Sequence, residues 1–317
     1  MAFLNKYGSL WGALPQTAGR IFWGAAGSSF TIDDTAWPAS DENDGLSPER
    51  PLRRVNRAWA LVTANAGDII VLLPGTHSAA NTSAVATSIA ANVAGVTMMG
   101  LPTSAGANLT RPRTILTIAA ADETVNVTAA DIEIAHITFL GDALNTASAN
   151  LDFSAAANRL YIHDCAVDVT AQTAGTSILG FDALGAAANV VIEGCAFTTD
   201  GAFGAMIDMT GTVDSLVQDC VFNHQTGILA SAITVGAASD RLTIRRCLFN
   251  DGAGTISAGV NGTGATITAG CLISNCRAGV TVTALATGWT SGEAELCNNF
   301  DFGIGATDGG VIITATA

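Results

Sequence analysis

A short phrase that recurs along the chain constrains its fold more than any other feature. Each copy has an aliphatic residue, two mostly polar residues, a cysteine, any residue, and then Phe or Val. The clear copies are residues 160–167, 190–197, 215–222 and 242–249, and their cysteines are 30, 25 and 27 residues apart. Such a period is typical of a solenoid, whose repeats bury their apolar faces by stacking. Because the phrase is short and lacks the periodicity of helical repeats, it predicts a parallel β-helix.

Weaker copies extend the pattern in both directions. They lie at residues 68–76, 96–101 and 134–139 upstream, and at 272–276 and 294–300 downstream. Together the copies predict about eight coils of roughly 20–35 residues each. The composition agrees, because 34 glycines and only 6% aromatic residues suit thin coils with small corners.

Charge and hydrophobicity exclude several classes of partner. The formal net charge is −14 and Lys6 is the only lysine, so attraction to a nucleic-acid backbone is not expected. No run approaches the ~20 apolar residues of a membrane-spanning helix, and the first residues do not resemble a signal peptide. We therefore expect neither nucleic acid nor membrane as a partner, and folding in a reducing cytoplasm.

The cysteines are predicted to form a buried column of free thiols. Five of the seven share one repeat position: Cys165, Cys195, Cys220, Cys247 and Cys276. Coils stack ~4.8 Å apart, so geometry alone does not forbid disulfides. One cysteine per coil does not make a tetrahedral zinc site. The histidines, His77, His136, His163 and His224, are scattered in the sequence. No metal and no cofactor are predicted.

Residues 1–43 are predicted to form an N-terminal arm, and residues 44–317 a capping helix plus the β-helix. The arm is rich in aromatic residues, which are typical of interface cores. Its candidate partner-binding residues are Phe3, Tyr7, Trp11, Phe22 and Trp23. Either these rings dock on another protein, which we favour, or they pack back on the chain's own coils.

A helix is predicted over residues 51–64, after an acidic loop at residues 31–50. Leu52, Val55, Trp59 and Val62 have helical spacing, and Pro51 suits a first turn. Such a helix would cover the open end of the solenoid. Its other face carries Arg53, Arg54 and Arg57, which either neutralise the acidic loop or form a basic patch for an acidic partner.

Residues 44–52, the Arg-rich helix, and the stretch 67–76 resemble the opening of the right-handed parallel β-helix superfamily, which includes pectate lyases and phage tailspikes. The later coils resemble it too, so the likeness covers about residues 44–300. It implies an all-β fold, a single-stranded right-handed parallel β-helix with an N-terminal arm and a capping helix. The arm and entry also resemble β-helix proteins encoded with bacteriophage structural genes.

Strand alternation predicts which side chains the coils display. One outward column reads Ala135, His163, Glu193, Gln218, Arg245, Ser274 and Glu295. The next column, near a corner, reads His136, Asp164, Gly194, Asp219, Arg246 and Asn275. Enzymes of the superfamily act on polysaccharides, and here the catalytic candidates would be Glu193, Asp164, Asp219 and Arg245. Carboxylates are sparse in each coil and exposed aromatic residues are few, so no enzyme is predicted.

The function predicted from the sequence is a non-enzymatic virion structural protein. More narrowly, it is a capsid decoration or cement protein held by its arm, forming a homotrimer that binds the major capsid protein or other virion proteins. It would be assembled into the virion in the host cytoplasm. The alternative is a tailspike or tail fibre that binds or depolymerises host surface polysaccharide. A third reading is a carbohydrate-binding adhesin.

Overall fold

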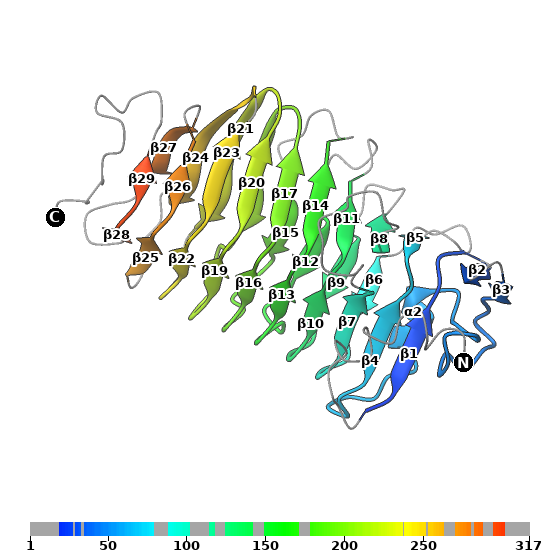
Figure 1. Ribbon diagram of the computed structural model, residues 1–317. Coiled ribbons are helices and arrows are strands. Elements are labelled where there is room, and N and C mark those ends of the chain that lie inside the picture. The colour runs from blue at the N-terminus through cyan, green and yellow to red at the C-terminus, as the bar shows by residue number, and fades with distance from the viewer. Residues whose placement is uncertain are drawn as a thin grey trace.

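The computed structural model describes residues 19–27, 29–32, 35–78, 88–101, 114–117, 124–141, 149–170, 178–236, 238–251, 253–262, 270–279, 282–287 and 294–301. In them the chain winds as a solenoid through three parallel sheets (Figure 1). Each full coil contributes one strand to each sheet in turn. The predicted right-handed parallel β-helix is confirmed.

The three sheets run the length of the solenoid. The ten-stranded sheet holds β1 (Ile21–Gly24), β4 (Ile69–Leu72), β7 (Thr97–Gly100), β10 (Glu133–Ala135), β13 (Tyr161–His163), β16 (Val191–Glu193), β19 (Leu216–Gln218), β22 (Thr243–Arg245), β25 (Cys271–Ser274) and β28 (Ala294–Cys297). The nine-stranded sheet holds β5 (Gly75–Ser78), β8 (Thr114–Thr117), β11 (Thr138–Leu140), β14 (Ala166–Val169), β17 (Ala196–Thr199), β20 (Val221–His224), β23 (Leu248–Asp251), β26 (Arg277–Ala278) and β29 (Phe300–Asp301). The eight-stranded sheet holds β6 (Ile89–Ala91), β9 (Val125–Val127), β12 (Leu151–Phe153), β15 (Ile178–Ala183), β18 (Phe203–Asp208), β21 (Ile228–Val235), β24 (Thr255–Gly262) and β27 (Val282–Thr287).

The core is built from columns of equivalent side chains. Phe197, Phe222 and Phe249 stack through the nine-stranded sheet with ring centroids 4.9 and 5.2 Å apart. The five cysteines of the phrase lie buried with free thiols, beside these rings in sequence. Each thiol lies against backbone carbonyls of its own coil and the preceding one, as Cys220 Sγ does at 3.2 Å from Gln218 O. The repeated phrase is thus the interior of the solenoid.

A two-residue corner, such as the one between β13 and β14, joins the ten-stranded sheet to the nine-stranded sheet. All the members of the predicted corner column have a left-handed backbone: His136, Asp164, Gly194, Asp219, Arg246 and Asn275, with φ between 52° and 61°. Asp, Asn, His and Gly tolerate this conformation better than other residues do. The amide of each corner still joins the ladder, since Asp164 N–H donates to Glu193 O at 3.1 Å. The corners therefore project their side chains in a regular row.

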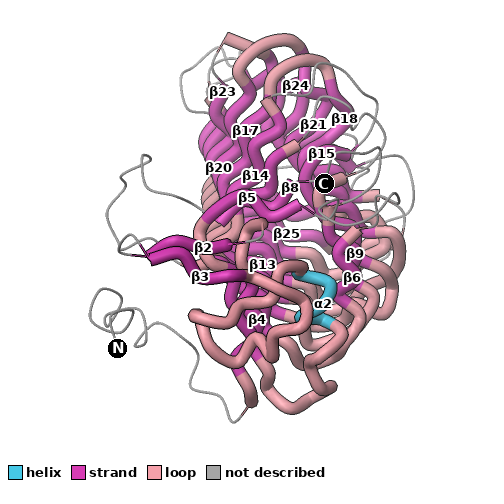
Figure 2. The backbone as a smooth tube through the Cα atoms, turned by 90° about the vertical axis from the view of Figure 1, so that its right-hand side faces the viewer, coloured by secondary structure: helices cyan, strands magenta, loops and turns pink. Residues whose placement is uncertain are grey.

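The N-terminal segment departs from the predicted arm. Strand β1 pairs in parallel with β4, so residues 21–24 lie in the first coil. Phe22 and Trp23 are each 2% exposed, which leaves them no surface for a partner and corrects their assignment as docking residues. The antiparallel strands β2 (Ser29–Ile32) and β3 (Thr35–Pro38) lie beside the solenoid's N-terminal end (Figure 2). Phe3, Tyr7 and Trp11 lie outside the described residues, and the division at residue 43 stays a prediction.

The capping helix is shorter than predicted. Helix α2 spans only Val55–Trp59, because Leu52 is bridged to Gly24 and Arg54 keeps an extended backbone. Its apolar face, Val55, Ala58 and Trp59, is buried in the core as expected. Arg54 forms an ion pair with Asp41, and Arg57 Nε donates to Asp41 O at 3.3 Å. These contacts favour the reading in which the arginines neutralise the acidic loop. No described helix is long and apolar enough to span a membrane.

Candidate functional site

A polar cluster interrupts the outer face of the ten-stranded sheet at β10, β13 and β16. The pairing aligns Glu133 with Tyr161, and His163 with Glu193. Because alternate residues of a strand share a face, these four side chains all point away from the core. Each is only partly exposed. The neighbouring coils toward the N-terminus carry apolar residues on this face instead, packed in a separate cluster that includes Trp23, Ile69 and Met99.

His163 is the centre of the cluster. Its Nε2 lies 2.9 Å from Glu133 Oε1, and its Nδ1 lies 2.8 Å from Asp164 Oδ2. The ring stacks on Tyr161 at 4.3 Å between centroids, with 23° between the planes. Thr97 donates to the other oxygen of Glu133 at 2.9 Å. The imidazole is therefore held at both nitrogens and on one face.

The electrostatics follow from these contacts. Burial opposes the charged form of His163, but hydrogen bonds to Glu133 and Asp164 outweigh it and raise its pKa. The bond from His163 holds the pKa of Glu133 below its ordinary value, against the effect of burial. Tyr161 donates to Glu193 Oε2 at 2.8 Å, and burial together with this bond raises its pKa to about 12. Tyr161 thus remains a neutral hydrogen-bond donor.

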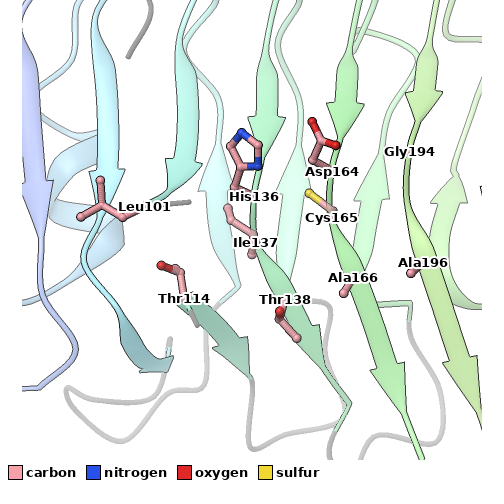
Figure 3. A pocket seen from close by; sticks show the side chains of 10 residues that line it. All are labelled: Leu101, Thr114, His136, Ile137, Thr138, Asp164, Cys165, Ala166, Gly194 and Ala196. Carbon is pink, nitrogen blue, oxygen red and sulfur yellow. The ribbon is translucent and has the colours of Figure 1, made fainter. Parts of the chain in front are cut away.

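His136 and Asp164 bring the cluster to the edge of a pocket. They occupy successive left-handed corners, and their side chains point the same way in Figure 3. The His136 ring meets His163 edge-on at 5.7 Å between centroids. Burial lowers the pKa of His136, against the pull of Asp164. No hydrogen bond of the His136 ring is seen within the described part of the chain, so it can bind a ligand.

The pocket has a volume of about 360 Å³ and lies along the corner between the two sheets. Its lining is Leu101, Thr114, His136, Ile137, Thr138, Asp164, Cys165, Ala166, Gly194 and Ala196. Gly194 lies in the corner beside Asp164, where an added Cβ would stand 3.3 Å from Asp164 Oδ1. The missing side chain keeps this carboxylate open toward the next coil.

The structure separates the four predicted catalytic residues into two groups. Asp164 and Glu193 belong to the His163 cluster, through His163 and Tyr161 respectively. Asp219 lies further along the corner row and is bound by Arg246 at 2.7 and 2.5 Å. Arg245 donates to Gln218 Oε1 at 2.7 Å. Of the four, only Asp164 lines the pocket.

Sequence reasoning missed Glu133, Tyr161 and Thr97, and it treated the histidines as scattered. The structure corrects the last point, because the rings of His136 and His163 meet from adjacent coils and Asp164 is bound to His163. One ligand atom from each of these three residues lies within 4.8 Å of the others, so the set can hold a metal ion. The signal was present in the repeats: aligning the phrases two residues earlier places Glu133 beside Tyr161 on the face of His163.

The known proteins that resemble this chain were found by similarity of fold and not by similarity of sequence. No model of a known protein family matches the chain, and no curated protein does. The pectin methylesterase PemA from Erwinia chrysanthemi aligns over 93% of this chain and 92% of its own, with a TM-score of 0.52 and 10% identity. A pectin methylesterase in complex with a hexasaccharide aligns over 81% and 87%, with a TM-score of 0.49 and 9% identity. An alginate lyase from Paenibacillus sp. str. FPU-7 aligns over 77% and 96%, with a TM-score of 0.31 and 14% identity.

These comparisons correct the function predicted from the sequence. The prediction of a capsid decoration protein without enzymatic activity is contradicted, because PemA, which has a similar fold, is by name a pectin methylesterase. Likeness to the β-helix superfamily is confirmed, whereas the narrower likeness to phage proteins has no support. The homotrimer, the virion partners and the virion location stay predictions, as do the absence of nucleic-acid and membrane partners.

Proposed function

We propose that this protein binds an extended polysaccharide along the corner between the two sheets and hydrolyses an ester on it. The observation that carries the proposal is the placement of His136 and Asp164 at the wall of the 360 Å³ pocket, backed by the His163 cluster. A pocket with a few convergent polar groups is the usual form of a site for a small ligand or a sugar residue. A protein of similar fold that carries the name pectin methylesterase supports a polysaccharide substrate.

The carboxylates favour an ester over the glycosidic bond. Glycosidases use two carboxyl groups about 5–9.5 Å apart, one on each side of the scissile bond. Among the residues that line the described pocket, Asp164 alone carries a carboxyl group. Glu193, in the next coil, is bound to Tyr161. A single carboxylate beside imidazoles suits the activation of one water molecule, which is what ester hydrolysis requires.

The reaction then consumes one water molecule and breaks one ester bond. His136 and Asp164 hold a water against the ester carbonyl, and the Asp164 carboxylate accepts one of its protons as the oxygen attacks the carbonyl carbon. The bond from that carbon to the alkoxy oxygen breaks, and the alcohol leaves with the proton. Fixing the water in this geometry is itself a large part of catalysis. His163, Glu133 and Tyr161 position Asp164 and His136 through the contacts described above.

The test is an assay on a panel of methylated, acetylated and unesterified polysaccharides. We expect release of acid and alcohol from an esterified substrate, and a loss of at least ~100-fold in kcat/KM for His136→Asn. Asn tolerates the left-handed corner, so this change removes the imidazole without disturbing the backbone. The matched control is Asp131→Asn, a left-handed residue of the same coil that is bound to Arg159 and lies outside the pocket.

Three outcomes would contradict the proposal. Reducing ends or unsaturated products without ester cleavage would show that the protein cleaves the glycosidic bond and not an ester. Full activity in His136→Asn would show that the reaction occurs elsewhere. Absence of both turnover and binding across the panel would show that a polysaccharide is not the substrate.

A further inference from the structure

We propose that His136, His163 and Asp164 bind a divalent zinc-class metal ion at the wall of the pocket. Two imidazoles and one carboxylate are a donor set that zinc takes in catalytic sites, where a fourth position is left for water or substrate. Candidate ligand atoms of the three residues lie within 4.8 Å of one another. In a tetrahedral site with bonds of about 2.0–2.1 Å, ligand atoms are about 3.3 Å apart, so small side-chain rotations complete the geometry.

The surroundings of His163 resemble those of a metal-binding histidine. Such a histidine usually gives its second nitrogen to a carboxylate, which sets the tautomer and the orientation of the ring. Here Nε2 of His163 is bound to Glu133 at 2.9 Å, and Thr97 fixes Glu133 from behind at 2.9 Å. The stacked ring of Tyr161 limits rotation of the imidazole. Nδ1 is thereby directed toward Asp164, at 2.8 Å, and a metal would take the place of its proton once the two atoms move apart to about 3.3 Å.

The positions of His136 and Asp164 complete the site. Both are corner residues with a left-handed backbone, so the coil stack holds their side chains as neighbours in one row. His136 supplies a ring without another hydrogen bond among the described residues. Gly194, the next residue of the row, brings no side chain over Asp164. Because His136 and Asp164 both line the pocket, a metal held by them would be open to it and would activate a water there.

The donor atoms of the proposed site favour a zinc-class metal over calcium. Calcium takes six to eight oxygen ligands, whereas this set offers two nitrogens and one carboxylate. The buried thiol column is a separate group: Cys165 lines the pocket, but its Sγ lies against the carbonyl of His163 at 3.3 Å. We therefore expect nitrogen and oxygen coordination without sulfur.

The experiment is titration of the metal-free full-length protein with Zn²⁺ by calorimetry, with Ca²⁺ as a comparison and Co²⁺ as a spectroscopic probe. We expect one Zn²⁺ per chain, no Ca²⁺ binding, and a four- or five-coordinate Co²⁺ spectrum without a thiolate band. Binding should be lost in His136→Asn and Asp164→Asn, which both keep residues suited to the corner. Glu133→Gln should weaken it about 10–100-fold. Asp131→Asn should bind like the unaltered protein.

The inference shares its pocket with the proposed function but is tested without substrate. Absence of Zn²⁺ binding, unchanged affinity in His136→Asn, or a thiolate band in the Co²⁺ spectrum would overturn the metal site. Ester hydrolysis by metal-free protein would then leave the proposed function standing. Conversely, zinc binding without any polysaccharide turnover would retain the metal and contradict the proposed function. Melting temperatures of all variants, measured in parallel, separate loss of ligand from loss of fold.

Discussion

Single residues with a left-handed backbone set the outline of each coil. One row begins the strands of the ten-stranded sheet and includes Asp131, Arg159, Asn189, Asp214 and Arg241. Within it, Arg159 binds Asp131 and Arg241 binds Asp214, one coil away in each case. These exposed ion pairs add little stability, typically below about 1 kcal/mol. The left-handed backbone of these residues matters more than the ion pairs do, because it turns the chain without adding residues to the coil.

A different row of residues carries an unfavourable charge. Asp152, Asp182 and Asp208 are aligned across β12, β15 and β18. Burial and the neighbouring Asp208 raise the pKa of Asp182 to about 6. The folded protein therefore holds this proton more tightly than the unfolded chain does. Stability should fall as the pH rises from about 4 to about 6, with the full penalty present above that range.

We expect Asp182→Asn to stabilise the protein at pH 7. Removing the repulsive charge should increase the free energy of unfolding by about 1 kcal/mol. This value allows for solvent, which screens part of the repulsion at a half-buried position. At pH 4 the difference should vanish, because Asp182 is then protonated in the folded state. Urea unfolding at the two pH values measures both numbers. An equal effect at pH 4 and pH 7 would mean that charge is not the cause.

At the scale of elements, the coils are joined by columns that cross from strand to strand. The aromatic column runs from Phe139 through Phe181 to Phe197, Phe222 and Phe249, with edge contacts first and parallel stacking afterwards. The sequence predicted the last three rings from the phrase. It did not predict Phe181, which belongs to the eight-stranded sheet and reaches the column across the interior. Contacts across the coil have no fixed sequence spacing, so periodicity cannot reveal them.

The column should be sensitive to loss of a ring at its centre. Phe222 is fully buried between two stacked rings, so Phe222→Ala should lower the free energy of unfolding by about 3–5 kcal/mol. Leu184→Ala is the matched control, since Leu184 is 59% exposed and its loss should cost less than about 0.5 kcal/mol. Chemical unfolding followed by circular dichroism gives both values. Similar losses of unfolding free energy in the two variants would show that the stacked rings do not contribute specially to stability.

At the scale of the whole molecule, a narrow solenoid carries a large negative charge. The net charge of −14 lies on thin coils whose interior is filled by small, aliphatic and aromatic side chains. Self-repulsion destabilises such a compact state, and dissolved salt screens it. The described ion pairs are mostly exposed, so screening them loses little.

Salt should therefore stabilise this protein. Raising NaCl from about 0.01 M to about 1 M shortens the screening length from about 30 Å to about 3 Å. We expect the melting temperature to rise by a few degrees, measured by differential scanning calorimetry at pH 7. Repeating the scan with an uncharged osmolyte of equal osmolality controls for general solvent effects. A fall in melting temperature with salt would show that the attractive pairs dominate the repulsion.

The sequence alone determined the wound stack of coils, the buried cysteine position and the corner row, because alternation within a strand and residue preference at a corner are local properties. Only the tertiary structure decided that Glu133 and Tyr161 meet at His163, and that His136 and Asp164 share a pocket. The cysteines of successive phrases are 30, 25 and 27 residues apart, so sequence distance does not give position in space. Parallel pairing between coils sets the register despite these unequal spacings, and it is this register that assembles the site.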